Sequence, residues 1–296
     1  MVRYTACPVC GSGKLRPVFR VTDYAVSHEH FELGACSDCG LRFTQDAPGE
    51  ADIQRYYQSD EYISHSDTNK GLINRLYHIA RKRTLTSKRS LLSAETGLQK
   101  GTLLDIGAGT GAFVQYMQKT GWQVTGLEPD EQARKKALDL YQVHLLSLDK
   151  LYDQDENRYD VITLWHVLEH VHKLHQYLDQ VKKMLKPAGR IFIAVPNYTS
   201  YEAGVYQNYW AAYDVPRHLY HFSPASMKQL LRIHDLVVHG IRPMWYDSFY
   251  ISLLSEKYKT GKDHPIKGFL NGAVSNAKAC FNIEKCSSLI YVAGKA

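Results

Sequence analysis

The stretch Leu103-Leu104-Asp105-Ile106-Gly107-Ala108-Gly109-Thr110-Gly111 decides the fold of this chain. Its first four residues are mostly apolar and are typical of a buried β-strand. The three glycines that follow let the backbone pass close to a bound ligand, and they precede a helix whose N-terminus faces that ligand. The stretch therefore predicts a strand–turn–helix unit with a binding site at the turn.

The chain on the C-terminal side of this turn continues the same alternation of apolar runs and helical periods. The expected strands are WQVTGL (122–127), a segment near QVHLLSL (142–148), YDVITLW (159–165), RIFIAVPN (190–197), LVVHGIRPM (236–244) and SSLIYVAGKA (287–296). Strands and helices that alternate at this spacing predict an α/β fold with a doubly wound, mainly parallel sheet. Ligands of such a sheet bind at the carboxyl ends of its strands.

Composition divides the chain into three parts. Residues 1–45 carry paired cysteines, 46–98 are aromatic and basic with helical spacing, and 99–296 hold the α/β domain. Two long segments interrupt that domain, a Tyr-rich insertion at 198–222 and a helical insertion at 246–287. Ser223 and Pro224 predict the start of a helix directly after the first insertion.

The N-terminal part contains two C-x-x-C pairs, in CPVCG and CSDCG. Their four cysteines are Cys7, Cys10, Cys36 and Cys39. Two such pairs about 25 residues apart fit a tetrahedral site with four thiolate ligands, so we expect a small zinc-ribbon-like segment with a structural Zn²⁺. A redox pair or two disulfides are the alternative interpretation. Cys280 and Cys286 lack this spacing and are expected to be packed side chains.

The overall composition bounds the class of protein. The chain has 296 residues, of which 44% are apolar and 22% charged, so it can bury a core. We find no apolar run long enough to span a bilayer and no export signal at the N-terminus, and therefore expect a cytoplasmic protein. The net charge of +6 is compatible with an anionic substrate and is weak support for nucleic-acid binding.

Two carboxylates near the glycine turn distinguish between adenosine cofactors. Glu128 ends the second strand, where an acid bridges two ribose hydroxyls. Asp105 lies just before the turn, where it would repel a pyrophosphate and favour a cation such as the ammonium of S-adenosylmethionine. The glycine order is G-x-G-x-G instead of the dinucleotide pattern G-x-G-x-x-G. Together these features favour S-adenosylmethionine over NAD.

LLDIGAGTG, GLEPD, YDVITLWHVLEHV, LKPAGRIFIAVPN and PRHLYHFSP resemble class I S-adenosylmethionine-dependent methyltransferases, and the chain is most similar to a bacterial branch with an N-terminal CPVCG…CSDCG pair. The resemblance implies a seven-stranded sheet whose last strand is antiparallel. It implies that the turn and Glu128 line the cofactor, that Leu148 or Asp149 flanks the adenine, and that Trp165 and His166 line the methionine side. The cofactor-binding set is then Asp105, Gly107, Ala108, Gly109, Gly111, Glu128, Pro129, Leu148, Asp149, Trp165 and His166.

The segment WHVLEHVHKLH (165–175) holds four histidines and contains the H-x-x-E-H letters of a zinc-peptidase class. That motif needs a continuous helix, whereas His166 follows a strand, so we exclude a peptidase. A general base would assist methyl transfer to a hydroxyl or amine. His170 is the first choice, with His166, Glu169 and His218 as further catalytic candidates, and a purely structural role for His170 is the alternative.

A third interpretation rests on relatives of this class that carry E-x-x-E-H and hold a divalent metal there. In this chain Glu169 and His170 would be completed by His218 or His221. The Tyr-rich insertion supplies substrate-binding candidates with flat apolar faces and hydrogen-bond donors. They are Tyr209, Trp210, Arg217 and His221, and the alternative is that they only cap the end of the sheet.

We therefore expect methyl transfer from S-adenosylmethionine to a small-molecule or glycan-type acceptor, such as a nucleotide sugar, a polysaccharide intermediate or a quinone-like ring. One alternative is an RNA methyltransferase that grips RNA with the zinc ribbon and the basic helix Asn69–Ala94, which has seven Lys or Arg residues and no acid. That helix would otherwise present a solvated face or contact an anionic membrane peripherally. A second alternative is a non-enzymatic zinc-ribbon interaction protein on a degenerate methyltransferase fold.

Overall fold

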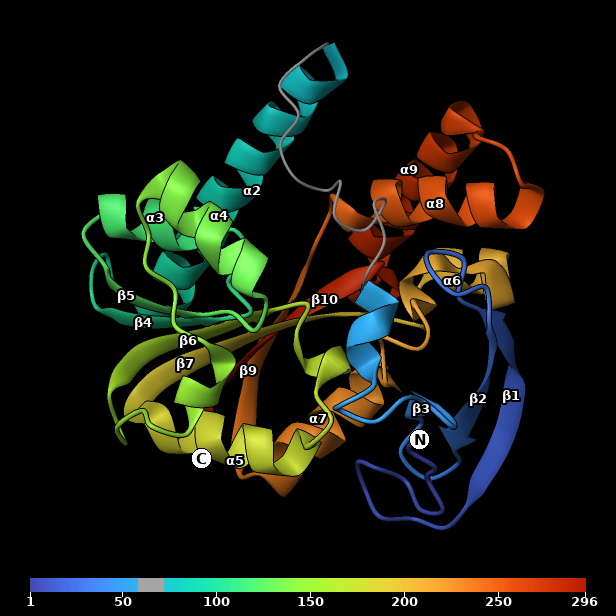
Figure 1. Ribbon diagram of the computed structural model, residues 1–296, viewed down its shortest axis with the longest axis horizontal. Helices are drawn as coiled ribbons and strands as arrows, with labels where there is room; N and C mark the ends of the chain where they lie inside the picture. The colour runs from blue at the N-terminus through green and yellow to red at the C-terminus, as the bar shows by residue number, and fades with distance from the viewer. Residues whose placement is uncertain (58–71) are drawn as a thin grey trace.

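The computed structural model describes residues 1–57 and 72–296, with side chains described for 1–57 and 83–296 (Figure 1). Its larger sheet has the strand order β5-β4-β6-β7-β10-β9. These strands are β4 (Thr102–Ile106), β5 (Gln123–Leu127), β6 (Tyr159–Trp165), β7 (Leu185–Pro196), β9 (Leu236–Pro243) and β10 (Ser288–Lys295). β5, β4, β6 and β7 are parallel, and β10 is antiparallel to both of its neighbours. The mainly parallel sheet and the antiparallel last strand are confirmed.

The described part of this sheet has six strands, so the expected number of seven was wrong. The segment near QVHLLSL contributes only a single bridge, from Leu146 to Leu127. The preceding helix α4 (Glu131–Tyr141) ends with Gln142 in the left-handed conformation, and a 3₁₀ turn, η2 (Leu148–Leu151), begins a few residues later. Pairing with β5 is therefore limited to this bridge and does not form a strand.

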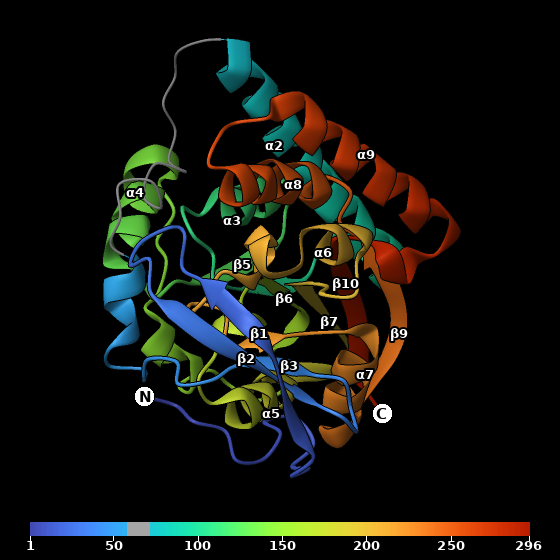
Figure 2. The same cartoon turned by 90° about the vertical axis from the view of Figure 1, so that its right-hand side faces the viewer.

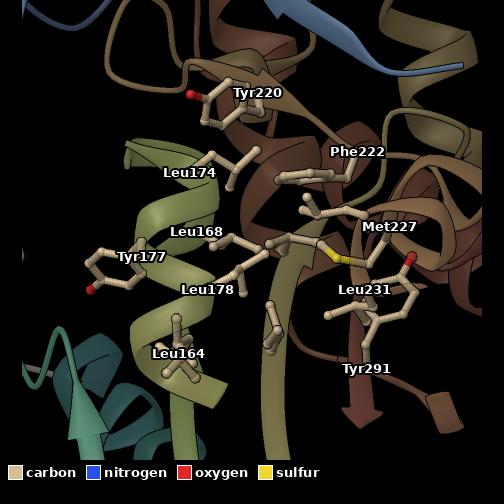
Figure 3. Packing of buried hydrophobic residues seen from close by; sticks show 14 of the residues in the cluster. Leu164, Leu168, Leu174, Tyr177, Leu178, Tyr220, Phe222, Met227, Leu231 and Tyr291 are labelled. Carbon is tan, nitrogen blue, oxygen red and sulfur yellow. The ribbon is translucent and has the colours of Figure 1, made fainter. Parts of the chain in front are cut away.

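Helices cover both faces of the sheet, as Figures 1 and 2 show. Because side chains alternate along a strand, Leu103, Val161 and Phe192 face α2 (Leu72–Thr96) and α3 (Ala112–Lys119). The next residues along the strands, Leu104 and Ile162, face the opposite cluster with α5 (Leu174–Met184) and α7 (Pro224–Ile233). Figure 3 shows this second cluster, in which Leu164, Leu168, Leu174, Tyr177, Leu178, Tyr220, Phe222, Met227, Leu231 and Tyr291 pack together.

A second, four-stranded sheet joins the N-terminal segment to the α/β domain. It has the order β1-β2-β3-β8, with β1 (Leu15–Thr22), β2 (His30–Cys36), β3 (Arg42–Thr44) and β8 (Tyr220–His221). β8 belongs to the Tyr-rich insertion and pairs antiparallel with β3, with Phe43 opposite Tyr220. The cysteine-bearing segment is therefore tied by backbone hydrogen bonds to residues that directly follow Arg217 and His218.

The insertions are helical. The first contains α6 (Tyr201–Tyr206), η4 (Gln207–Tyr209) and η5 (Ala211–Tyr213), and the second contains α8 (Asp247–Thr260), α9 (Pro265–Phe281) and η6 (Ile283–Lys285). Ser223 caps α7 in a capping box with Ser226, as expected.

In the N-terminal linker the structure has η1 (Ile53–Tyr57) and α2. The first residues of the basic helix expected over Asn69–Ala94, 69–71, lie outside the described residues. Among the described helices, we find none with the length and hydropathy of a bilayer-spanning segment.

Candidate active site

The glycine turn between β4 and α3 has the backbone that its sequence predicts. Gly107 and Gly111 have φ of 73° and 76°, in the left-handed region that side chains with a Cβ rarely adopt. A Cβ on Gly107 would lie 2.4 Å from a methyl of Val167, and one on Gly111 would lie 3.0 Å from Ala137. A larger residue at either position would clash with these neighbours, so both positions require glycine. Because neither glycine carries a side chain, the backbone of the turn stays accessible to a ligand.

Glu128 is held in place beside this turn. One carboxylate oxygen accepts a hydrogen bond from the backbone N–H of Gly109 at 2.8 Å, and the other accepts from the N–H of Asp130 at 3.0 Å. The side chain is largely buried, and burial raises the pKa of its carboxyl. An acid fixed at the ends of two neighbouring strands suits the ribose hydroxyls of an adenosine cofactor.

Asp105 lies beneath the turn and is buried. It accepts a hydrogen bond of 2.6 Å from the Thr163 hydroxyl. Burial raises the pKa of Asp105 to about 6, although Thr163 and the nearby Lys88 lower it. A positive charge next to Asp105 would stabilise the ionised form of its carboxyl. The position therefore suits a cationic ligand better than a pyrophosphate.

Lys88 on α2 was missed by the sequence analysis. Its ammonium lies 4.1 Å from the ring of Trp165 and 5.5 Å from that of Phe113, and the two rings meet edge to face. Burial lowers the pKa of Lys88 to about 8, and Asp105 and Asp247 oppose that shift. Nothing in the sequence separates Lys88 from the other basic residues of α2, because only the packing of α2 on α3 brings it to Trp165.

The other cofactor candidates lie along the same edge of the sheet. Ala108 donates its N–H to the carbonyl of Leu127 at 2.9 Å, and Pro129 is exposed just beyond Glu128. Leu148 packs against the core, whereas Asp149 is exposed and lies 3.8 Å from the ammonium of Lys150. Of these last two, Leu148 therefore offers the apolar surface that a flat base requires.

His166 has a φ of 57° and begins the loop after β6, so the H-x-x-E-H letters do not share a helix. Its Nδ1 lies 3.3 Å from Glu169 and its Nε2 lies 3.0 Å from Asp247, the first residue of α8. Burial alone would lower the pKa of His166, but these two carboxylates raise it to about 10. A protonated imidazole cannot accept a proton, so the geometry disfavours His166 as a base and gives it an ion-pairing role.

Glu169, His170 and His218 form a compact group whose ligand atoms lie within 4.8 Å of one another. Glu169 is fully buried, and its Oε2 has no hydrogen-bond partner among the described residues. The Nδ1 of His218 lies 2.9 Å from the Ala212 carbonyl, and its Nε2 lies 3.8 Å from the Asp214 carboxylate. Burial and His218 lower the pKa of His170 to about 4, so His170 is neutral at physiological pH.

His221 does not join this group, because its Nε2 lies 3.1 Å from the Thr44 hydroxyl. Of the two histidines considered as a third ligand, the structure brings only His218 to Glu169 and His170. Two imidazoles beside one carboxylate form a donor set that suits a divalent metal ion.

The Tyr-rich insertion is packed more tightly than its composition suggests. Trp210 is buried, and Tyr209 packs at the edge of the same hydrophobic cluster. Arg217 is buried, with hydrogen bonds of 2.8 Å to Asp23 and 2.6 Å to Asp214. The guanidinium of Arg217 thus ties the N-terminal segment to the insertion, and Arg217 lines a small pocket together with Trp210 and Tyr258.

The four N-terminal cysteines converge. The Sγ atoms of Cys7 and Cys39 are 3.5 Å apart, those of Cys10 and Cys36 are 3.6 Å apart, and all four are free thiols. Tetrahedral zinc–thiolate bonds of about 2.3 Å place sulfurs about 3.8 Å apart. The observed separations are close to this value and far longer than a disulfide bond of about 2.05 Å, so the four cysteines do not form disulfides in this structure. Cys280 and Cys286 lie outside this group. Cys286 is buried, as expected of a packed side chain, whereas Cys280 is exposed at the end of α9, so the expectation was wrong for Cys280.

Glu202 on α6 gives a prediction about stability. It is fully buried, and neither carboxylate oxygen has a hydrogen-bond partner among the described residues. Burial raises its pKa to about 7, although the hydroxyls of Ser275 and Ser287 lower it. The pKa of Glu202 is higher in the folded chain than in the unfolded chain. The contribution of this carboxyl to the free energy of unfolding is therefore complete below about pH 4, and it is lost as pH rises through 7.

In the unsubstituted chain, ionisation of Glu202 should lower the free energy of unfolding by roughly 3 kcal/mol between pH 5 and pH 8. In Glu202→Gln this contribution to the pH dependence should be absent, because glutamine does not titrate. Urea unfolding at the two pH values measures this difference. Glu131→Gln, at an exposed position in the first turn of α4, is the control and should change neither value. Parallel pH profiles for the Glu202→Gln variant and the unsubstituted chain would contradict the prediction.

Comparisons with known proteins agree with this geometry. A family model described as a methyltransferase domain matches residues 77–240, more than half of the chain. The chain is 24% identical over 200 residues to the ubiquinone biosynthesis O-methyltransferase of Alkalilimnicola ehrlichii, covering 62% of this chain and 77% of that one. It is 27% identical over 163 residues to the human mitochondrial ubiquinone biosynthesis O-methyltransferase, covering 50% of this chain and 44% of that one. The chain thus spans less than half the length of the human relative.

Solved structures support the fold. Magnesium protoporphyrin IX methyltransferase from Synechocystis, crystallised with bound S-adenosylhomocysteine, superposes with a TM-score of 0.55 at 12% identity and covers 84% of this chain and 100% of that one. The PH0226 protein from Pyrococcus horikoshii superposes with a TM-score of 0.52 at 14% identity and covers 81% of this chain and 100% of that one. By its family match, its fold and its glycine turn, the chain belongs to the class I S-adenosylmethionine-dependent methyltransferases.

Proposed function

We propose that this enzyme transfers a methyl group from S-adenosylmethionine to a hydroxyl group of a small molecule, and that the acceptor is a quinol-like ring. The observation that carries the proposal is the group formed by Glu169, His170 and His218 at the carboxyl end of β6. It lies next to Trp165 and His166 on the rim expected for the methyl-donating side of the cofactor. The ubiquinone biosynthesis O-methyltransferases among its relatives support a ring hydroxyl as the acceptor.

The residues of the glycine turn would hold the cofactor, with Glu128 at the ribose and Asp105 near its positive charge. S-Adenosylmethionine supplies a methyl group already activated on a sulfonium sulfur. The protein's task is then to align the acceptor and to exclude water. The ion pair of Asp247 with His166 fixes the start of α8 against the loop after β6, and α8 would close that side of the site.

We propose that Glu169, His170 and His218 hold a divalent cation next to the acceptor hydroxyl. Glu169 uses Oε1 for His166, and its buried Oε2 remains available for a ligand. A bound divalent ion would favour the deprotonated form of a hydroxyl beside it, which is the form that attacks a methyl group. The role of His170 as a base, expected from the sequence, then becomes that of a ligand.

The acceptor classes suggested by the Tyr-rich insertion have less support. Sugar binding needs exposed aromatic faces, and Trp210 and Tyr213 are buried. The side chains of the first half of α2, on which the RNA alternative depends, lie outside the described residues. A small ring hydroxyl therefore remains the acceptor that the described geometry supports best.

We also propose that Cys7, Cys10, Cys36 and Cys39 bind a structural Zn²⁺. Their convergence and their spacing support it. Because β3 and β8 share a sheet, a metal that orders the N-terminal segment would also order the residues around His218.

Glu169→Gln tests the function at its central residue. We expect it to lower kcat/KM at least about 100-fold for methyl transfer to 3,4-dihydroxybenzoate in the presence of Mg²⁺ or Mn²⁺. Affinity for S-adenosylhomocysteine should change little, because the glutamine side chain keeps an oxygen at the position that contacts His166. Methyl transfer is measured with labelled S-adenosylmethionine, and direct Mn²⁺ binding is measured by paramagnetic resonance.

His144→Ala, at an exposed position before η2, is the matched control and should retain full activity. An unchanged rate for Glu169→Gln, with no Mn²⁺ binding to the unsubstituted enzyme, would overturn the metal site. Methylation of RNA or of a nucleotide sugar, with no transfer to ring hydroxyls, would overturn the acceptor class.

A further inference from the structure

The amphipathic pattern of α9 is reversed. Its buried residues are small, namely Gly268, Gly272, Ser275 and Ala279. Its exposed residues include Ile266, Phe269, Leu270, Val274 and Phe281, with exposed fractions of 77%, 56%, 57%, 40% and 95%. A helix on the surface of a globular protein normally buries its large apolar residues and exposes polar ones. The outer face of α9 is thus built for an apolar environment.

The small residues explain how α9 is held. A Cβ on Gly268 would lie 2.9 Å from the Cα of Leu253, and one on Gly272 would lie 2.9 Å from the Cα of Phe249. The two backbones therefore approach closely, in the way that small residues permit between helices in membranes. Phe249 stacks on Phe269 with ring centroids 4.9 Å apart, so the apolar surface continues from α9 onto α8.

The apolar face is bordered by groups that suit the surface of a bilayer. Trp245, Tyr246 and Tyr250, around the start of α8, are 40–48% exposed, and Trp and Tyr prefer the boundary between lipid and water. Lys259 and Lys262 are exposed around the α8–α9 turn, where Asp263 is the nearby acid. Figures 1 and 2 show α8 and α9 side by side at the outer edge of the molecule, on the same side of the large sheet as α3.

We propose that the outer face of α8 and α9 binds the surface of an anionic lipid bilayer. This face combines an apolar stripe, interfacial aromatic residues and lysines, which together characterise helices that lie in a membrane interface. Anionic headgroups complement these lysines, whereas a second copy of this chain would bring lysines and a net charge of +6 against their like. The proposal does not depend on the identity of the methyl acceptor.

The outer face of α8 and α9 is connected to the active site through the first residue of α8. Asp247, the first residue of α8, pairs with His166 at 3.0 Å. The helix that lies on the lipid therefore begins at the methyl-transfer site. An acceptor dissolved in the bilayer would reach the enzyme from the side on which the enzyme is anchored.

Co-sedimentation with vesicles tests the proposal on the full chain. We expect binding to vesicles of equal parts phosphatidylglycerol and phosphatidylcholine, and much weaker binding to pure phosphatidylcholine. The double variant Phe269→Asp/Leu270→Asp should lose at least about tenfold in partitioning, because two apolar side chains no longer enter the interface. Leu140→Asp on α4 is the matched control, since Leu140 is 52% exposed, close to the 57% of Leu270. It should bind like the unsubstituted chain.

Lys259→Glu/Lys262→Glu should lower binding to the anionic vesicles several-fold and reduce its dependence on salt. The control pair is Lys119→Glu/Lys135→Glu, at exposed positions on α3 and α4. Circular dichroism checks that all variants are folded, and sedimentation velocity measures their oligomeric state.

Equal binding to neutral and anionic vesicles would overturn the proposal as stated. Absence of vesicle binding would also overturn it. If the unsubstituted chain then proves dimeric and Phe269→Asp/Leu270→Asp monomeric, a second copy covers this face instead.

Discussion

Glu128→Ala is expected to weaken the binding of S-adenosylmethionine and S-adenosylhomocysteine at least about 100-fold, because a carboxylate contributes about 1.5–3 kcal/mol for each hydrogen bond that it makes to a ligand hydroxyl. The carboxylate of Glu128 is already oriented by the N–H groups of Gly109 and Asp130. No rearrangement is needed for it to meet two ribose hydroxyls, so its removal loses both bonds without compensation.

Titration calorimetry with S-adenosylhomocysteine measures this loss independently of catalysis. Glu131→Ala removes an exposed acid three residues further along the chain and should bind like the unsubstituted enzyme. The melting temperature of Glu131→Ala should stay close to that of the unsubstituted enzyme, whereas Glu128→Ala, which loses two hydrogen bonds to backbone N–H groups, should stay folded but melt at a lower temperature. Unchanged affinity in a folded Glu128→Ala variant would mean that the ribose is held elsewhere.

Loss of a zinc ligand should have the second large effect. We expect the purified chain to carry one zinc per molecule, and Cys36→Ser to reduce this content severely. Structural zinc stabilises small domains by about 10 kcal/mol or more in isolated zinc-finger peptides, so the variant should melt at a clearly lower temperature. The N-terminal segment contributes three strands to its sheet, and a bound zinc would add to the contacts that β8 and Arg217 already make with it.

Metal analysis and calorimetric melting measure these effects. Cys280→Ser, at an exposed cysteine of α9, is the matched control and should change neither zinc content nor melting temperature. Activity should fall together with zinc in Cys36→Ser, because β3 pairs with β8 directly after His218. A chain that contains no zinc after purification under reducing conditions and still melts cooperatively would contradict the structural role of the metal.

Both of these sites could be predicted because their residues lie close together in the chain. The glycine turn and Glu128 belong to one strand–turn–helix–strand unit, and each cysteine pair lies within four residues. Local rules of backbone geometry and ligand spacing apply directly to such segments. The capped start of α7 followed from local patterns in the same way, whereas the antiparallel last strand was implied by the resemblance to class I methyltransferases.

The sequence by itself thus determined the fold class, the glycine turn after β4, the acid that lies beside it and the convergence of the four cysteines. Only the tertiary structure decided the roles of residues whose partners are far away in the chain. Arg217, expected at the substrate, is used by Asp23, and His166 is kept protonated by Asp247. These outcomes depend on burial and on charges brought together by packing, and the spacing of residues along the chain carries no information about either.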